Sequence, residues 1–404
     1  MPTPSDASTY FRKGFGLKSE VQEELATAYD GQIVDYLRSH DYTLTVGDVT
    51  VHLAREFGFC YGVERAVEYA YQARRKFPDR RIFLVGEIIH NPHVNDRLRD
   101  MGIEILTHPE PTGSFDFSGI NADDVVIMPA FGVTIDDFAR LRDIGCILVD
   151  TTCGSVLNVW KRVDAYARDG FTALIHGKYY HEETRATASQ ARKYDGHYLV
   201  VRNMDEARLV CDYIEGRVSA EALMAKFEPA VSPGFDPLKH LERIGVANQT
   251  TMLARESLAI GEEVGAAIAR ARGSEARTAS FRSFDTICSA TQERQDAVQE
   301  LLAVGVDVMV VIGGFNSSNT ISLAAMCADS VPTYHIETST GIDPESRSIH
   351  YRAAAIKHAE LDRVDWLPAG PVRIGITAGA STPNNKIGDV VTRVLATREL
   401  RAEL

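Results

Sequence analysis

Long apolar runs, closely spaced cysteine pairs and a surplus of basic side chains are all missing from this chain of 404 residues. Because no run of about 18 apolar residues occurs, we expect no transmembrane helix. The N-terminal stretch MPTPSDASTYFRKGFGLKSE contains acidic side chains and no apolar core segment. It is typical neither of a secretory signal nor of a transit peptide, so we expect a cytoplasmic protein.

The charge balance excludes one broad class of partner. Asp and Glu number 56 against 43 Lys and Arg, which gives a formal net charge of −13. A general nucleic-acid binder needs clustered Lys and Arg, so we expect no nucleic-acid partner. An acidic chain can still bind an anionic substrate in a locally built pocket. The composition, 45% hydrophobic and 25% charged, is that of a soluble globular protein, and the length predicts two or three domains.

Cysteines are few and widely spread. The six are Cys60, Cys146, Cys153, Cys211, Cys288 and Cys327. Six in a chain of this length do not indicate a disulfide scaffold. No C-x-x-C pair occurs, which argues against a zinc ribbon or a thioredoxin-type motif. Any site that the cysteines build must therefore be assembled from distant parts of the chain.

Short apolar runs alternate with amphipathic stretches from Val49 onward. Nine runs are predicted strands: 49–54, 81–88, 124–131, 146–150, 171–177, 197–202, 244–250, 307–314 and 372–379. The clearest predicted helices cover 63–77, 156–170, 253–272 and 290–305. Such alternation indicates α/β units with parallel sheets. Residues 1–48 are predicted to be an appended arm, and 216–243 an insertion.

Three cysteines share one sequence frame. Cys60 in FGFCYGVERAV, Cys153 in LVDTTCGSVLNVW and Cys288 in FDTICSATQERQ each follow a predicted strand and precede a predicted helix. In parallel α/β sheets the ligand site lies at the carboxyl ends of the strands. Three domains around a pseudo-threefold axis would bring three such ends to one point. We therefore expect α/β domains at 49–149, 150–284 and 285–404, after an arm at 1–48.

The residues alone leave several interpretations of these cysteines open. They can be three unrelated buried thiols, or part of a disulfide or a nucleophilic site. Three thiolates can also hold a [4Fe–4S] cluster and leave the fourth iron open. A zinc site would need a fourth ligand, for which His90 or His181 is available. The other three cysteines do not share this frame, and we expect buried core thiols there.

Two loops and three short motifs are rich in hydrogen-bonding groups. GGFNSSNT (313–320) and GITAGASTP (375–383) each follow a predicted strand and open a helix, which favours an anion cradle, although Ser and Asn also cap helices and form turns elsewhere. IIHN (88–91), HEET (181–184) and NQTT (248–251) also follow predicted strands or enter loops. Histidine can pair with phosphate, and the Glu two residues after His181 could deliver protons.

These segments, taken together and in order from about Val49 to the C-terminus, closely resemble the 4-hydroxy-3-methylbut-2-enyl diphosphate reductases. The arm, the insertion and HGKYYHEET resemble the longer branch of that family, found in cyanobacteria and plastids. The resemblance implies a trefoil of three similar α/β domains with small, mainly parallel sheets around a central [4Fe–4S] cluster.

The implied reaction removes the hydroxyl of the allylic substrate reductively and yields isopentenyl and dimethylallyl diphosphates, with ferredoxin or flavodoxin as electron donor. The implied cluster ligands are Cys60, Cys153 and Cys288. Glu183, aided by Thr250, is the implied proton donor. The implied substrate-binding residues are His90, His181, Thr250, Ser317, Ser318, Asn319 and Ser381.

Two departures from the family pattern stand out. Short members of the family have His at the position of Phe131, whereas the longer branch has Phe there, as this chain does. Lys178 or His176 is a candidate to replace the diphosphate contact of that His. Gly154 and Ser155 follow Cys153, where the family usually has Pro, which could loosen that loop. The alternative functions are a non-catalytic iron–sulfur redox sensor or electron carrier on the same fold, and a hydro-lyase with an open-iron cluster.

Overall fold

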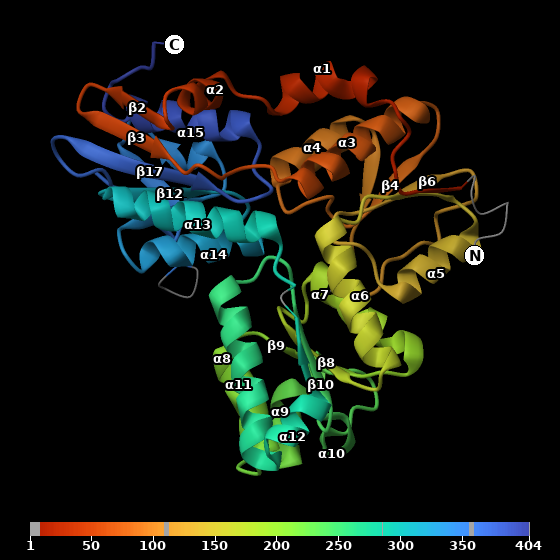
Figure 1. The fold of residues 1–404 in the computed structure, drawn as a ribbon. Coiled ribbons are helices and arrows are strands. Elements are labelled where there is room, and N and C mark those ends of the chain that lie inside the picture. The colour runs from red at the N-terminus through yellow and green to blue at the C-terminus, as the bar shows by residue number, and fades with distance from the viewer. Residues whose placement is uncertain (1–8, 109–112, 285, 355–358, 404) are drawn as a thin grey trace. The chain divides into compact units, whose positions relative to one another are not determined.

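The computed structural model describes residues 9–108, 113–284, 286–354 and 359–403 (Figure 1). The chain forms two compact units. The first unit holds the residues up to Gly14, Phe77–Ile88 and Gly102–Cys288. The second unit holds Phe15–Lys76, Ile89–Met101 and the chain from Ser289 onward. Both units are discontinuous in sequence, so the continuous domain ranges 49–149, 150–284 and 285–404 stay a prediction.

One sheet of the first unit has five strands, all parallel, in the order β1-β7-β6-β4-β5. Its strands are β1 (Tyr10–Phe11), β4 (Ile82–Val85), β5 (Ile103–Leu106), β6 (Val125–Met128) and β7 (Ile147–Asp150). The three central strands β4, β6 and β7 are buried at every residue, as expected where helices cover both faces of a parallel sheet. Helix α5 (Ile135–Ile144) follows β6, and α6 (Gly154–Arg168) follows β7.

A second sheet of this unit has four parallel strands in the order β11-β10-β8-β9. These are β8 (Thr172–His176), β9 (Tyr198–Val201), β10 (Ile244–Asn248) and β11 (Phe281–Ser283). The helices between and after them are α7 (Glu182–Ala191), α8 (Met204–Ile214), α9 (Ala220–Phe227), α10 (Pro237–His240), α11 (Ala254–Arg272) and α12 (Ser274–Ser280). The predicted insertion at 216–243 contains α9 and α10 (Figure 1).

The second unit is built on an eight-stranded mixed sheet, β14-β15-β13-β12-β17-β3-β2, with β16 paired to β15. The neighbours β13, β12, β17 and β3 are parallel, and the edge strands are antiparallel. The strands are β2 (Thr43–Val46), β3 (Val49–Leu53), β12 (Val308–Ile312), β13 (Thr333–Ile336), β14 (Ile342–Asp343), β15 (Ser348–Arg352), β16 (Glu360–Val364) and β17 (Val372–Ala378). The helices are α1 (Lys18–Tyr29), α2 (Gln32–Ser39), α3 (Tyr61–Lys76), α4 (Pro92–Asp100), α13 (Ser289–Val304), α14 (Ser318–Ala328) and α15 (Asn384–Ala396).

All nine predicted strands are present, and the prediction of an α/β protein with mainly parallel sheets is confirmed. The N-terminal arm is more ordered than its polar composition suggests. Strand β1 extends the five-stranded sheet, β2 pairs with β3, and α2 packs against α15. The arm therefore contributes to the core of each unit.

Candidate functional site

Two of the three cysteines in the shared frame belong to the first unit, and each lies where a strand ends and a helix begins. Cys153 is the N-cap residue of α6, and its backbone N–H donates to Ala130 O at 2.9 Å. Burial raises the pKa of its thiol, while the N–H groups of Ser155 and Val156 act in the opposite direction. Cys288 directly precedes α13. Asp285, part of the second Asp-Thr frame, lies outside the described residues.

Ser155, one of the two residues that depart from the family pattern after Cys153, has a structural role that the sequence did not reveal. The Ser155 hydroxyl donates to the Cys288 sulfur at 3.2 Å. A side chain on the helix that follows one of these cysteines thus contacts another of them. Ser155 ties the loop of Cys153 to that of Cys288, which opposes the loosening expected from the missing proline.

The HEET and NQTT motifs meet around one buried carboxylate. Glu183, only 1% exposed, lies in the first turn of α7. One of its oxygens accepts from the backbone N–H of Thr250 at 2.6 Å, and the other accepts from the Thr250 hydroxyl at 3.0 Å. His181 caps the same helix, with Nδ1 accepting from the N–H of Glu183 at 3.2 Å. The structure thus brings together His181, Glu183 and Thr250.

Phe131 and the two candidate substitutes occupy different environments. The Phe131 ring lies edge-on to His181, with ring centroids 5.5 Å apart, so it supports the imidazole by packing. His176 is fully buried in β8 and contacts Ser257 Oγ at 2.7 Å. Burial lowers the pKa of His176 to about 4, so it is neutral at physiological pH and unsuited to pairing with a diphosphate. Lys178 is the better candidate of the two.

Positioning residues that the sequence reasoning missed hold these loops together. Gln249, fully buried, accepts at Oε1 from the Lys178 N–H and the Thr184 hydroxyl, both at 3.1 Å. A Cβ at Gly177 would lie 2.7 Å from Thr184 Oγ1, which explains the glycine in HGKYYHEET. The Thr286 hydroxyl bonds to the Asn248 side chain and so ties the loop before Cys288 to NQTT. The signal for Gln249 was its place inside NQTT.

The third cysteine, Cys60, lies in the second unit, before α3. Its N–H donates to Ala380 O at 3.3 Å, which aligns FGFC with the loop after β17. Gly58 has φ +66°, and an added Cβ would lie 3.0 Å from Thr382 O, so the position requires glycine. The nearly buried Arg294 donates to Gly58 O at 2.7 Å. Sequence reasoning missed Arg294 as a support of this loop.

Five predicted substrate-binding residues lie in the second unit, in its loops or at the start of α14: His90, Ser317, Ser318, Asn319 and Ser381. β12 and β3 each pair in parallel with β17, so the loops after these strands lie at one edge of the sheet. The Ser381 hydroxyl donates to His90 O at 3.1 Å, and Asn319 Oδ1 accepts from the Ala380 N–H at 2.9 Å. Ser317 caps α14 and contacts Thr320.

Asn319 carries the clearest sign of a missing partner. Its side chain is 2% exposed, and within the described residues Nδ2 has no hydrogen-bond acceptor. A buried amide donor without a partner is costly, and a ligand oxygen would satisfy it. Ser318, at the first position of α14, is also buried. The start of α14 therefore suits an anion.

The remaining cysteines are core thiols, as expected. Cys146, Cys211 and Cys327 are at most 2% exposed, and burial raises their pKa values to about 11, 12 and 12. All six cysteines lie within the described residues, and none forms a disulfide. The disulfide interpretation is thereby excluded.

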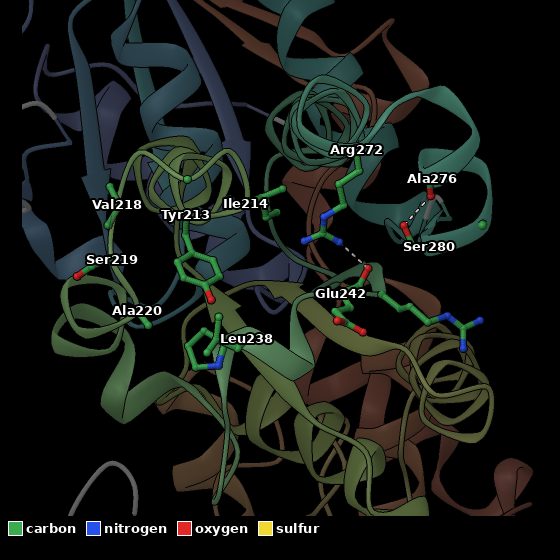
Figure 2. A pocket seen from close by; sticks show the side chains of 14 residues that line it. Tyr213, Ile214, Val218, Ser219, Ala220, Leu238, Glu242, Arg272, Ala276 and Ser280 are labelled. Atoms are coloured by element: carbon green, nitrogen blue, oxygen red, sulfur yellow. Dashed lines mark hydrogen bonds between the residues drawn. The ribbon is translucent and has the colours of Figure 1, made fainter.

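A cavity of about 720 Å³ lies elsewhere in the first unit. Figure 2 shows Tyr213, Leu238, Glu242 and Arg272 around it, with Arg272 donating to Glu242 O. Much of its lining comes from the insertion at 216–243, and none of the predicted site residues takes part. This cavity is therefore separate from the candidate site.

None of the helices that the structure describes has the length and apolar character needed to cross a membrane.

Comparison with known proteins gives consistent results. The LytB protein family model matches residues 51–395. The 4-hydroxy-3-methylbut-2-enyl diphosphate reductase of Acaryochloris marina is 46% identical over 405 residues, covering 98% of this chain and 95% of the relative. That of Thermosynechococcus vestitus is 46% identical over 400 residues, covering 98% and 96%. Matches of this extent take in most of the N-terminal arm.

Two solved structures are also similar to this chain. The first is that of (E)-4-hydroxy-3-methyl-but-2-enyl diphosphate reductase, the terminal enzyme of the non-mevalonate pathway. It is 30% identical with a TM-score of 0.52, and the match covers 85% of this chain and 98% of that one. The Plasmodium falciparum E-1-hydroxy-2-methyl-but-2-enyl-4-diphosphate reductase, 20% identical with a TM-score of 0.61, covers 85% and 87% and supports the fold alone. The chain belongs to the family of 4-hydroxy-3-methylbut-2-enyl diphosphate reductases, terminal enzymes of the non-mevalonate pathway.

Proposed function

We propose that this chain converts (E)-4-hydroxy-3-methylbut-2-enyl diphosphate to isopentenyl and dimethylallyl diphosphates, with Glu183 as the proton donor. The reaction takes up two electrons and two protons, breaks the C–O bond of the allylic alcohol and releases water. Hydroxide is a poor leaving group, so a proton must reach that oxygen as the bond breaks. The observation that carries this proposal is the buried Glu183 carboxylate, held at both oxygens by Thr250.

The thiols fit the iron–sulfur cluster that the family implies. Cys60, Cys153 and Cys288 are free of disulfides, and each directly precedes a helix or caps its start. Backbone N–H groups at a helix N-terminus favour a thiolate. These three residues would hold a [4Fe–4S] cluster, which would supply electrons and a Lewis-acidic iron open to the substrate oxygen. Three protein ligands leave that iron available.

The second unit supplies neutral groups for the diphosphate. Asn319 Nδ2 offers a buried donor, and Ser317 and Ser318 lie at the start of α14, where backbone N–H groups favour an anion. We assign Ser381 and His90 to the same role, and His181 and Thr250 to the substrate oxygen atoms. Such a cradle binds an anion without a cationic surface, which agrees with the net charge of −13.

The remaining assignments extend this proposal. The electron donor would be ferredoxin or flavodoxin, and the location the cytoplasm. The three domain ranges given above, each with one cluster cysteine, remain part of the proposal.

The decisive experiment is anaerobic. The protein is reconstituted with iron and sulfide, supplied with dithionite-reduced viologen and the hydroxymethylbutenyl diphosphate, and the products are separated by chromatography. We expect both C5 diphosphates. A fully loaded protein that binds the substrate but forms neither product would reject this function and favour a redox sensor or electron carrier. Loss of water without consumption of reductant would favour a hydro-lyase.

A further inference from the structure

The N-terminal arm reaches the strand that leads into Cys153. Strand β1 pairs in parallel with β7, with Tyr10 opposite Leu148 and Phe11 opposite Val149. The Leu148 N–H donates to Thr9 O at 2.7 Å. β7 ends at Asp150, three residues before Cys153. The arm therefore forms an edge of the sheet directly beside the DTTC motif.

One carboxylate joins the arm to this motif. Asp150 is buried, and its Oδ2 accepts from the Tyr10 hydroxyl at 2.6 Å and lies 3.3 Å from Arg12 Nε. Its Oδ1 accepts from the N–H of Thr152 at 3.0 Å and from the Thr152 hydroxyl at 2.5 Å. The two oxygens of Asp150 therefore have different partners: Oδ2 contacts the N-terminal arm, and Oδ1 accepts from Thr152, the residue that precedes Cys153.

The loop needs this support because its surroundings are not tightly packed. A cavity of about 270 Å³ is lined by Tyr10, Arg12, Asp150, Thr152 and Trp160, among others. Side chains beside empty space have fewer contacts that hold them in place. On this side of the loop, hydrogen bonds through Asp150 replace packing. Hydrogen bonds to a charged group are strong enough for that role.

We propose that Tyr10 and Arg12 are positioning residues for Cys153, which they orient through Asp150 and Thr152. This role rests on the proposed function, in which Cys153 is a cluster ligand. The N-terminal arm then supports the reaction indirectly. Removing the Tyr10 and Arg12 contacts leaves Asp150 Oδ2 without these partners, lets the Asp150 side chain move, and allows the Thr152–Cys153 backbone to shift into the cavity.

The test compares Tyr10→Phe and the double variant Tyr10→Phe/Arg12→Gln with the wild type. In metal-free full-length chain, the alkylation rate of Cys153 by iodoacetamide is followed by peptide mass spectrometry, with Cys60 in the same sample as internal reference. In reconstituted protein, the rate of iron release to a chelator is measured anaerobically. The matched control is Tyr334→Phe, which removes a buried tyrosine hydroxyl that donates to Trp366 O in the second unit.

We expect Cys153 in the double variant to alkylate at least about ten times faster, roughly the loss of one charged hydrogen bond, with Cys60 unchanged and iron release accelerated in parallel. An unchanged Cys153 rate, or equal acceleration at Cys60 or in Tyr334→Phe, would overturn the positioning role. A separate Cys153→Ser variant tests the ligand assignment. If it keeps its full iron content, the assignment of Cys153 as a ligand fails, while the alkylation rates still decide whether the arm positions this loop.

Discussion

Thr250 donates to both oxygens of the Glu183 carboxylate, with its backbone N–H at 2.6 Å and its hydroxyl at 3.0 Å. Glu183 follows β8 and Thr250 follows β10, neighbouring parallel strands, so their loops meet at one end of the sheet. The two hydrogen bonds fix the carboxyl group in one orientation. A group fixed in this way can deliver a proton in a constant direction, which general acid catalysis requires.

Glu183→Gln should remove the transferable proton and preserve the geometry. The glutamine carbonyl can accept from the Thr250 N–H, and the hydroxyl can rotate to accept from the amide. We expect turnover to fall about 10²- to 10⁴-fold, the usual contribution of a general acid, with iron content and substrate binding retained. Steady-state kinetics and calorimetric binding measure this. Glu182→Gln, on the same helical turn but partly exposed, is the control. Near-normal turnover in Glu183→Gln would show that another group donates the proton.

The six cysteines should divide into two groups by iron content. Cys60→Ser, Cys153→Ser and Cys288→Ser should each lose most of the bound iron and sulfide, because a cluster held by three thiolates tolerates the loss of none. Cys211→Ala, a core substitution, should cost about 1 kcal/mol of unfolding free energy and keep full iron. Iron and sulfide per chain, with urea unfolding curves, provide the comparison. Full iron in any of the three serine variants would remove that residue from the ligand set.

Asn319→Asp should place a negative charge where we assign the diphosphate. Asp can still accept from the Ala380 N–H through the oxygen equivalent to Oδ1, so the loop contact survives. The buried Nδ2 donor becomes an oxygen that repels phosphate. We expect kcat/KM to fall at least about 100-fold, with most of the effect in KM and the melting temperature little changed. Asn203→Asp, which alters the N-cap of α8, is the isosteric control. An unaltered KM would contradict the assignment.

Ser155→Ala should change the reduction potential of the reconstituted protein. The Ser155 hydroxyl donates to the Cys288 sulfur, and such bonds stabilise the more negative, reduced form of a thiolate-bound centre. Loss of a bond of about 0.5–1 kcal/mol should lower a one-electron midpoint by about 20–40 mV. Spectroscopic redox titration measures the shift, and Ser155→Thr should restore it. Equal potentials in the alanine and threonine variants would show that the hydroxyl does not act on the sulfur.

The buried His176 should make folding stability depend on pH in a defined window. Its pKa is about 4 in the folded chain because of burial, against 6.5 for an ordinary histidine. The unfolded chain therefore takes up a proton first as pH falls, so stability is full above about pH 6.5 and declines toward pH 4. The difference corresponds to about 3 kcal/mol. Urea unfolding at pH 7.5 and 5 should show a shallower decline in His176→Gln. The exposed His350, whose pKa is raised by its hydrogen bond to Asp362, is a control of opposite sign, so His350→Gln should show a slightly steeper decline. An identical slope in His176→Gln would assign the loss of stability to other groups.

Much of the fold could be predicted because its central strands are continuous apolar runs, such as Val308–Ile312 and Ile244–Asn248. Some edge strands escaped prediction because they are polar, as in β16, which reads ELDRV and is mostly exposed. The sequence did not allow us to predict which sheet a strand joins, because parallel pairing links residues that are far apart along the chain. Val49–Leu53 pairs in parallel with Val372–Ala378, and not with β4, the next strand along the chain.

The candidate site, like the fold, could be predicted only in part from the sequence. Residue types and their motif frames identified Cys153, Glu183 and Asn319 as candidates. The contacts between motifs did not follow from the sequence, because hydrogen bonds such as Thr250 to Glu183 or Ser155 to Cys288 depend on where loops meet. The structure does not explain Gly154 either. An added Cβ there meets no atom within 4 Å, so steric crowding does not explain the glycine.

The pairing of β3 with β17 has a consequence for the order in which the protein matures. On the ribosome, β3 emerges long before its parallel partner β17 has been made, and until then it can form only its hairpin with β2. In the loop that carries Cys60, the Gly58 N–H donates to Ala378 O at the end of β17, and the Cys60 N–H donates to Ala380 O just beyond it. Nascent chains therefore cannot complete the Cys60 loop until β17 has been made. If Cys60 holds a cluster, as we propose, the cluster would be inserted only after that point, and a truncation that removes β17 should leave a metal-free protein.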